Sequence, residues 1–518
     1  MARNFLATER DQLYLMPPSI DEWLPDDHLA WFVLEAVEQF ELDTFYARYR
    51  DDGWGRPAYD PKLLAALLLY AYCCGERSSR KIERRCTEDV AFRVVAANHA
   101  PDHATISRFR ATHADALSGL FTDVLRLCAE AGLVSVGLVA IDGTKIAANA
   151  SPLKTVDATT IAAQVERILA EAEAVDAAED ELYGDARGDE LPEAMRTRAG
   201  RVQLLRELKA RLDAEDGAKR SEVDEHERLR IEAETTGQRP AGRPRKPRDP
   251  QQVKPARANT TDPDAKVMKT PSGFLLGYNA QAAVNEHQVI LAAWVSDQAS
   301  DAELFAPTLA TARDNLVAAE LEQSIDVVVA DAGYFSEANI RGETDADLYI
   351  ATGKASGLNA LPEGDADLGP LPRPRTNTID VDAEIVRRRD VLERWEAGEL
   401  TSEHAIAELG CSAPTAHQMR KAYRERGHVF RPVRFRGEAP RLTVKEWMTA
   451  KTTTATGRDL YRKRSTTVEP VFGQIKEAGR FRRFARRGRD ACDAEWKFAA
   501  TANNLLKAWR ARQLVPVG

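Results

Sequence analysis

The stretch around which the sequence is organised reads Tyr461-Arg-Lys-Arg-Ser-Thr-Thr-Val-Glu-Pro-Val-Phe-Gly-Gln-Ile-Lys476, and a basic run at 480–489 follows it. It places one carboxylate, Glu469, among many arginine and lysine residues. An acid in such surroundings can be a solvated salt-bridge partner, which contributes little to stability. It can also be a metal ligand beside a polyanion whose phosphates the bases hold. The choice depends on whether the chain supplies further carboxylates in a suitable setting.

The composition is that of a protein with several domains. The chain has 518 residues, of which 43% are hydrophobic and 30% are charged, and its net charge is -9. That charge argues against nucleic-acid binding by the whole surface, although basic runs occur at 239–257 and 458–489. The cysteines form no CxxC pair, so we expect neither a zinc site nor a disulfide framework. Because no apolar run approaches the ~20 residues that span a bilayer, we expect no membrane contact and a cytoplasmic location.

A buried strand is predicted immediately before Asp142. Residues 134–141 read Val-Ser-Val-Gly-Leu-Val-Ala-Ile, an apolar run rich in β-formers. Gly143 behind the aspartate allows close approach, so a metal ligand would be rigidly supported there. The alternative is an ordinary Asp-Gly turn between two strands, which this segment taken alone favours. The two interpretations are compatible, because a ligand can occupy the first position of such a turn.

The same pattern recurs at Asp331. An apolar strand is predicted at 324–330 and ends at this aspartate, with Gly333 nearby and a helix from Glu337. If the two strands are neighbours, both carboxylates reach one crevice at the edge of the sheet. The remaining predicted elements are a hairpin of strands at 273–284 and 288–295, a helix near 301–316 and a strand at 348–352.

Short helices are predicted near the N-terminus. Asp60 and Pro61 are typical of a helix start, apolar residues recur at helical spacing over 63–72, and Gly75 ends the helix. A later helix, from about Thr105, presents basic and hydroxyl residues at its start, as the recognition helix of a helix-turn-helix does. Its DNA contacts would be Ser107, Arg108 and Arg110. The alternative is a small helical bundle with a solvated basic face, and the residues leave both open.

Two segments interrupt the predicted sheet. The first is an antiparallel helical hairpin over 158–234, followed by a basic, proline-rich linker. Within that linker, 242–247 looks like an AT-hook, although a plain cationic linker accounts for it better. The second segment contains a helix-turn-helix pattern over 403–424, with an ordinary helical hairpin as the alternative. Its side chains facing DNA would be Thr415, Gln418, Arg420 and Lys421.

Asp142, Asp331 and Glu469 together fit a two-metal site. Two Mg²⁺ ions about 3.5–4 Å apart require bridging and flanking carboxylates, and they serve both the attacking and the leaving oxygen of an in-line displacement. Mg²⁺ takes hard oxygen ligands, which agrees with the lack of Cys or His clusters. The neighbouring bases would then neutralise a DNA backbone.

On these residues the chain resembles the DDE transposases of bacterial insertion sequences, and among them the group with a Tyr-Arg-Glu-Lys signature. Tyr461, Arg464, Glu469 and Lys476 occupy that signature, with one residue more than usual between the arginine and the glutamate. The resemblance also rests on Asp-Gly-Thr-Lys at 142–145 and on Asp-Ala-Gly-Tyr-Phe-Ser at 331–336. Each segment is weak alone, whereas the combination is specific.

The resemblance implies an α/β fold with a ribonuclease-H-like catalytic core, a mixed sheet flanked by helices. We expect this core to be formed by 131–150, 262–352 and 456–513, and to be interrupted by inserts at 151–261 and 353–455. An all-helical DNA-binding region at 1–130 would precede it.

The resemblance further implies cleavage at the terminal inverted repeats of a mobile element, then attack of the freed 3′-OH on target DNA. Two Mg²⁺ ions, replaceable by Mn²⁺, would bind Asp142, Asp331 and Glu469. The protein would act as a homodimer on DNA and would be associated with the bacterial nucleoid. The side chains that would contact DNA near this site are Tyr461, Arg464, Lys476, Arg480, Arg482 and Arg483. An aromatic side chain, Trp447 or Trp496, could hold a flipped base, although core positions suit both better. The alternatives are a nuclease on the same core and a non-catalytic or domesticated DNA-binding protein.

Overall fold

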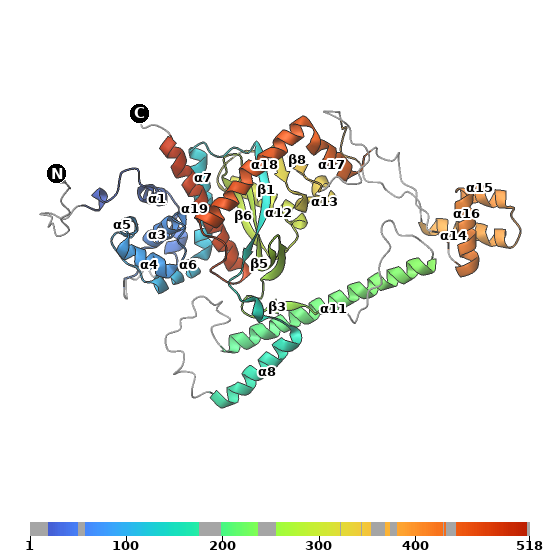
Figure 1. Ribbon diagram of the computed structural model, residues 1–518, viewed down its shortest axis with the longest axis horizontal. Helices are drawn as coiled ribbons and strands as arrows, with labels where there is room; N and C mark the ends of the chain where they lie inside the picture. The colour runs from blue at the N-terminus through green and yellow to red at the C-terminus, as the bar shows by residue number, and fades with distance from the viewer. Residues whose placement is uncertain are drawn as a thin grey trace, which may run out of the picture.

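A mixed β-sheet covered by helices forms the centre of the molecule, with a group of N-terminal helices beside it (Figure 1). The computed structural model describes residues 19–49, 57–175, 198–236, 255–321, 323–342, 344–353, 368–372, 381–427, 429–430 and 442–514. One hydrophobic core extends from the N-terminal helices through the sheet to the C-terminal helix. The architecture is therefore mixed α/β, as predicted.

The sheet has six strands in the order β4-β5-β1-β7-β8, with β6 paired to β5. The pairs of β5 with β1, β4 and β6 are antiparallel, whereas β1 with β7 and β7 with β8 are parallel. The predicted hairpin of β5 and β6 is confirmed, while β4 was not predicted. The strands are β1 (Leu138–Ala147), β4 (Lys266–Thr270), β5 (Gly273–Asn285), β6 (Ile290–Ser296), β7 (Val327–Ala330) and β8 (Asp347–Ile350).

The prediction for the strand at Asp142 was wrong in its ends. β1 begins at Leu138 and runs through to Ala147, so the Asp-Gly pair lies within the strand and makes no turn. Gly143 pairs with Gln281 of β5, and a Cβ at this glycine would stand 2.3 Å from the Gln281 amide nitrogen. The glycine therefore allows a close approach between neighbouring strands rather than a reversal of the chain.

The parallel pairing of β1 with β7 decides where the aspartates lie. The register runs from Leu138 opposite Val327 to Ile141 opposite Ala330, and the next residue on each strand is an aspartate. Because the carboxyl ends of parallel strands meet at the same edge, Asp142 and Asp331 lie at the same level of the sheet.

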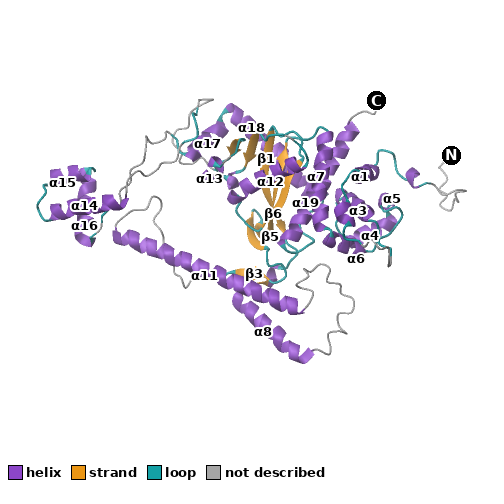
Figure 2. Ribbon diagram, turned by 180° about the vertical axis from the view of Figure 1, so that it is seen from behind, coloured by secondary structure: helices purple, strands orange, loops and turns teal. Residues whose placement is uncertain are grey.

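Helices cover both faces of the sheet (Figures 1 and 2). Trp294 of β6 donates to Thr308 of α12 on one face, while Arg464 of α18 meets Asp142 on the other. The short strand β7 is followed by a 3-10 turn (Ala332–Tyr334) and α13. These helices are α12 (Phe305–Ala318), α13 (Glu337–Arg341), α17 (Val444–Thr453), α18 (Ala455–Gly473) and α19 (Arg489–Leu514).

The N-terminal helices pack on the core through α7 and α19. The predicted start of α3 is confirmed, because the Asp60 carboxylate accepts from the backbone N–H of Lys62 at 2.8 Å, and Pro61 is the first helical residue. Gly75 follows that helix with φ +70, and a Cβ there would meet the carbonyl of Ala478 at 2.3 Å. The helices are α1 (Leu29–Glu38), α2 (Asp43–Tyr46), α3 (Pro61–Cys73), α4 (Ser79–Glu88), α5 (Val90–Val95), α6 (His103–Thr112) and α7 (Ala114–Glu130).

The first insert is a helical hairpin closed at its base by a two-stranded sheet. Strands β2 (Thr155–Asp157) and β3 (Arg257–Asn259) pair antiparallel and bring its two ends together. Beyond them, α8 (Ala158–Val175) packs on the first third of the long helix α11 (Arg198–Thr236), as Figure 1 shows. The helical hairpin is thus confirmed, while the AT-hook-like stretch at 242–247 lies outside the described residues.

The second insert carries three helices with a hydrophobic core of their own: α14 (Val381–Glu396), α15 (Ser402–Leu409) and α16 (Ala413–Arg426). The predicted turn between α15 and α16 is confirmed, because Gly410 adopts φ +61 there. The sequence pattern also predicts that Ser412 caps the second helix of this pair, but its side chain makes no capping hydrogen bond, and its hydroxyl meets that of Thr415 at 2.8 Å instead. Near the ends of this insert, the hydroxyls of Thr352 and Thr449 lie 2.6 Å apart.

None of the helices in the described part of the chain is both long and apolar enough to cross a membrane.

Candidate active site

The two aspartates are held by the sheet and by nearby backbone N–H groups. Asp142 is largely buried, with its side chain 15% exposed, and its carboxylate accepts from the N–H of Gly143 at 2.8 Å. Asp331 caps the 3-10 turn after β7 by accepting from the N–H of Gly333, also at 2.8 Å. Both carboxylates are therefore positioned by backbone rather than by mobile side chains.

The third acid, Glu469, is carried by α18 and joined to Asp142 by an arginine. Arg464, on the same helix, donates from Nη2 to Asp142 at 2.7 Å and from Nη1 to Glu469 at 3.1 Å. The arginine side chain is 15% exposed and that of Glu469 is 54% exposed. The extra residue between Arg464 and Glu469 thus does not keep the two side chains apart.

Burial dominates the ionisation of Asp142. It raises the pKa of this carboxyl to about 6, although Arg464 acts in the opposite direction, and the charge of Asp331 raises it further. Asp142 is therefore an anion at neutral pH, held in a setting that weakly disfavours its charge.

Asp142→Asn is expected to change how stability depends on pH. The folded pKa lies above the ordinary value of 3.8, so the contribution of Asp142 is fully present below pH 3.8 and is lost as the pH rises through 6. Between pH 4.5 and 7.5 the wild type should lose roughly 2 kcal/mol of unfolding free energy relative to the variant. Urea unfolding of both proteins across this range measures the difference, and parallel curves would contradict the prediction.

A proline beside Glu469 makes α18 depend on a glutamine from the sheet. Pro470 has no N–H, so the carbonyl of Thr466 lacks its partner within the helix. Gln288, in the β5–β6 turn with φ +63, supplies one by donating its amide to that carbonyl at 2.9 Å. The same side chain accepts from Gln474 at 3.2 Å and from Lys507 at 2.7 Å. Gln288 therefore fixes the part of α18 that carries the third acid.

Gln288→Ala is expected to lower the unfolding free energy by about 0.5–1.5 kcal/mol, because it removes the hydrogen bonds to the Thr466 carbonyl and the Lys507 ammonium. Chemical denaturation of the variant against wild type measures the loss. Gln323→Ala, at an exposed loop position, is a matched control with an expected change within ~0.5 kcal/mol. Equal losses of unfolding free energy in the two variants would show that the hydrogen bonds of Gln288 do not stabilise α18.

The chain after Glu469 leaves the regular α-helix. A π-helical turn, Gln474–Ala478, extends α18 and turns Lys476 toward the sheet, where its ammonium contacts the hydroxyl of Thr144. Burial lowers the pKa of Lys476, and the nearby Arg482 lowers it further. Extra-residue turns of this kind are frequent at functional sites. Lys476 is thus placed two residues along β1 from Asp142.

The basic loop that follows, residues 480–489, is anchored by contacts with α19 and with Arg77, and several of its arginine side chains are exposed. Glu495 of α19 accepts from the N–H of Ala485 at 2.9 Å and from that of Arg486 at 3.1 Å. Arg77 donates to the same carboxylate at 2.9 Å and to the carbonyl of Arg480, also at 2.9 Å. The side chains that the loop leaves exposed include the predicted DNA contacts Arg480, Arg482 and Arg483.

Family comparisons match two segments of the chain. The transposase domain family DUF772 matches residues 18–112, which hold helices α1 to α6. The transposase DDE domain family matches residues 416–509, which include α17, α18 and most of α19. Both matches are transposase domains. They support a DDE transposase of the insertion-sequence type, and with it DNA as the partner.

The transposase DDE match contains Glu469, Lys476 and the basic loop, whereas Asp142 and Asp331 lie outside both matched segments. The mixed α/β architecture is consistent with the ribonuclease-H-like core of DDE transposases. Comparison with curated proteins and with solved structures gives no match.

Some predicted DNA contacts are occupied within the fold. Arg110, in the segment that matches the DUF772 family, donates to the carbonyl of Arg77 at 2.8 Å and to the hydroxyl of Ser79 at 3.1 Å, so it holds α6 to the start of α4. Arg420 of α16 pairs with Glu396 at 2.5 Å and lies over the ring of Trp395, which joins α16 to α14. Both guanidinium groups are therefore bound within the fold.

Other predicted contacts remain accessible. Arg108 and Gln418 are exposed, while Ser107 is half-buried. Trp496 is fully buried and donates to the carbonyl of Gln281 at 2.9 Å, so it is a core residue. Trp447 is partly buried and donates to the carbonyl of Gly369 at 3.2 Å.

One acid of this region was missed by the sequence analysis. Asp301, before α12, accepts at one carboxylate oxygen from Lys145 at 3.0 Å, from Asn279 at 2.6 Å and from Gln281 at 3.3 Å. A Cβ placed on Gly333 would meet its other oxygen at 3.3 Å. Asp301 thus lies beside the backbone that follows Asp331. No strand ends at this residue, so no sequence signal marked it.

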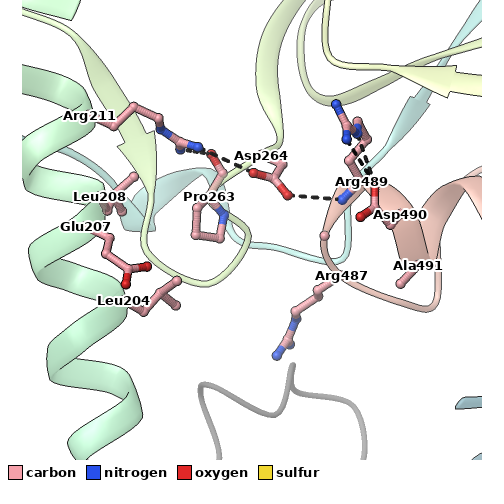
Figure 3. Close-up of a pocket in the computed structure, with 11 residues that line it drawn as sticks. Leu204, Glu207, Leu208, Arg211, Pro263, Asp264, Arg487, Arg489, Asp490 and Ala491 are labelled. Atoms are coloured by element: carbon pink, nitrogen blue, oxygen red, sulfur yellow. Dashed lines mark hydrogen bonds and ion pairs between the residues drawn. The ribbon is translucent and has the colours of Figure 1, made fainter. Parts of the chain in front are cut away.

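A pocket of about 390 Å³ lies away from these acids, between α11 and the end of the basic loop (Figure 3). Four of its charged groups form two pairs: Arg211 meets Asp264 at 3.4 Å, and Arg489 meets Asp490 at 3.1 Å. We therefore interpret this pocket as part of the interface between the first insert and the core.

Proposed function

We propose that the protein is a DNA transposase that cleaves the ends of an insertion sequence and joins the freed 3′-OH to target DNA. The observation that carries the proposal is the pairing of β1 with β7, which sets Asp142 and Asp331 side by side, with Glu469 linked to Asp142 through Arg464. The ribonuclease-H-like core would comprise 131–150, 262–352 and 456–513, with the inserts and the N-terminal helical region as predicted.

The donor set fits Mg²⁺, because its members are carboxylate oxygens and a protein cation already bridges two of them. Within the described residues, no three His, Cys, Asp or Glu side chains lie close enough together to hold one ion. Arg464 contacts both Asp142 and Glu469. The residues that would hold the ions are Asp142, Asp331 and Glu469. Two bound Mg²⁺ ions, or Mn²⁺ in their place, would activate the attacking oxygen and stabilise the leaving oxygen of a phosphodiester.

The remaining residues bind and orient DNA. Lys476, beside Thr144 and two residues along β1 from the first aspartate, would hold a phosphate at the cleavage site. The exposed arginines of the basic loop would hold the flanking backbone in a manner that weakens with salt. Tyr461, half-buried one turn before Arg464, would limit how DNA enters the site. Bringing two element ends together requires two protomers, so the active form would be a homodimer on DNA.

The test uses the full chain with a labelled duplex that carries the element's terminal repeats and with a target plasmid. In Mg²⁺ we expect cleavage at the repeat ends and a joined product, and in EDTA neither. Cleavage without a joined product would favour a nuclease on the same core. DNA binding without any cleavage would overturn the proposal and favour a non-catalytic DNA-binding protein.

A further inference from the structure

Arg464 occupies the place where two of the proposed metal ligands converge. Its guanidinium contacts Asp142 at 2.7 Å and Glu469 at 3.1 Å through two different nitrogens. The side chain is 15% exposed, so the contact is not a loose surface pair. In the DNA-free protein, a cation of the chain itself therefore neutralises these two carboxylates.

This arrangement leaves the arginine incompletely bonded. Its Nε is buried and, among the residues that the structure describes, has no hydrogen-bond partner. The remaining acid, Asp331, accepts instead from the N–H of Gly333. A guanidinium binds best when paired nitrogens meet a bidentate acceptor, and a phosphate presents oxygens at that spacing. Arg464 is thus held mainly by its ion pairs with the two carboxylates. A phosphate, which can bind two of its nitrogens at once, can therefore compete with them for the guanidinium.

A divalent ion and this guanidinium compete for the same two carboxylates. Mg²⁺ requires oxygen ligands at about 2.0–2.1 Å in near-octahedral geometry. The arginine nitrogen 2.7 Å from the Asp142 carboxylate takes up part of the space around that oxygen. Two adjacent cations would also repel each other beside this carboxylate, whose side chain is largely buried. Arg464 therefore opposes metal binding.

We propose that Arg464 closes the acid site to divalent ions until a DNA phosphate takes its guanidinium, so that DNA binds before the metal. This inference rests on the proposed function and adds an order of assembly to it. By linkage, DNA strengthens metal binding by the same factor by which the metal strengthens DNA binding. Without DNA, the divalent ions of the cell would then not fill the site.

The direct test measures Mn²⁺ binding to the DNA-free full chain from the electron spin resonance signal of free Mn²⁺. Arg464→Met is expected to bind Mn²⁺ at least about tenfold more tightly than wild type, within the usual range of coupling between sites. Arg464→Lys should lie between, because one ammonium keeps the charge but loses the two-nitrogen bridge. The matched control is Arg462→Met, an exposed arginine on the same helix, which should bind as wild type does.

The second arm measures binding of an end duplex by fluorescence anisotropy, with and without Ca²⁺ at fixed ionic strength. Ca²⁺ should tighten duplex binding by wild type and by Arg462→Met, and much less by Arg464→Met.

If Arg464→Met and Arg464→Lys both bind Mn²⁺ no more tightly than Arg462→Met, the inference is overturned even if cleavage still requires the acids. If adding Asp142→Asn or Asp331→Asn to Arg464→Met leaves the Mn²⁺ affinity of Arg464→Met unchanged, the metal assignment itself fails, which is a separate result. Should the methionine variant not fold, as judged by circular dichroism, the lysine variant carries the comparison.

Discussion

Asp331→Asn is expected to lower the rate of end cleavage by about a thousandfold or more while leaving the fold and DNA binding intact. The substitution keeps the size of the side chain and removes the charge that a metal ligand needs. An asparagine oxygen can still accept from the N–H of Gly333, so the turn after β7 should survive. A loss of this size, ~4 kcal/mol of transition-state stabilisation, is what one lost electrostatic contact at a reacting centre produces.

The same strand provides the control. Asp326 is exposed and lies just before the start of β7, at the end of the strand opposite Asp331. Asp326→Asn removes the same charge and should leave the cleavage rate within twofold of wild type. Single-turnover cleavage at saturating protein, with duplex affinity measured separately, gives both quantities. If Asp331→Asn cleaves as fast as Asp326→Asn, Asp331 is not a catalytic residue.

Arg77→Met is expected to destabilise the protein by about 3–5 kcal/mol, because it leaves the buried carboxylate of Glu495 without its cation. The Glu495 side chain is fully buried, and Arg77 contacts it at 2.9 Å. The same guanidinium lies 4.2 Å from the ring centre of Phe481 and binds the carbonyl of Arg480, which adopts φ +51. One side chain from the N-terminal helices thus holds a strained turn of the basic loop.

Urea unfolding followed by circular dichroism measures this loss. Adding Glu495→Gln to Arg77→Met should recover part of it, because the unpaired charge is then gone while a side-chain oxygen remains for the N–H groups of Ala485 and Arg486. Arg80→Met, at an exposed position of α4, should change the stability by less than ~0.5 kcal/mol. Similar losses at Arg77 and Arg80 would contradict the role of the buried pair.

The sequence was informative where a local pattern determines the structure. Asp331 follows a continuous apolar strand and precedes a glycine, and both features are local, so its position beyond β7 could be predicted. The end of β1 could not, because Gly143 is compatible with a turn until the partner strand is known. That Asp142 and Asp331 are neighbours depends on the parallel pairing of strands nearly 190 residues apart, which no local pattern encodes.

The functions of individual cations were the least predictable. An arginine on a helix has the same local sequence whether it faces DNA or binds a group of its own fold. Arg110 and Arg420 both bind groups of their own fold, and these partners come from other helices or loops of the chain. The bridge from Arg464 to Asp142 is a further case, since 322 residues separate them. Asp301 escaped prediction for the same reason, as its three donors come from two strands of the sheet.

Closure of the first insert at its base, and of the second near its ends, has a consequence for how such proteins can diversify. β2 pairs with β3 where the first insert begins and ends, and the hydroxyls of Thr352 and Thr449 meet close to the ends of the second. A segment whose ends are already adjacent can be exchanged or deleted without stretching the sheet that holds the acids. The three helices α14 to α16, which have their own core, can therefore be replaced as a cassette. Such a replacement would leave the six-stranded sheet and its two aspartates in place.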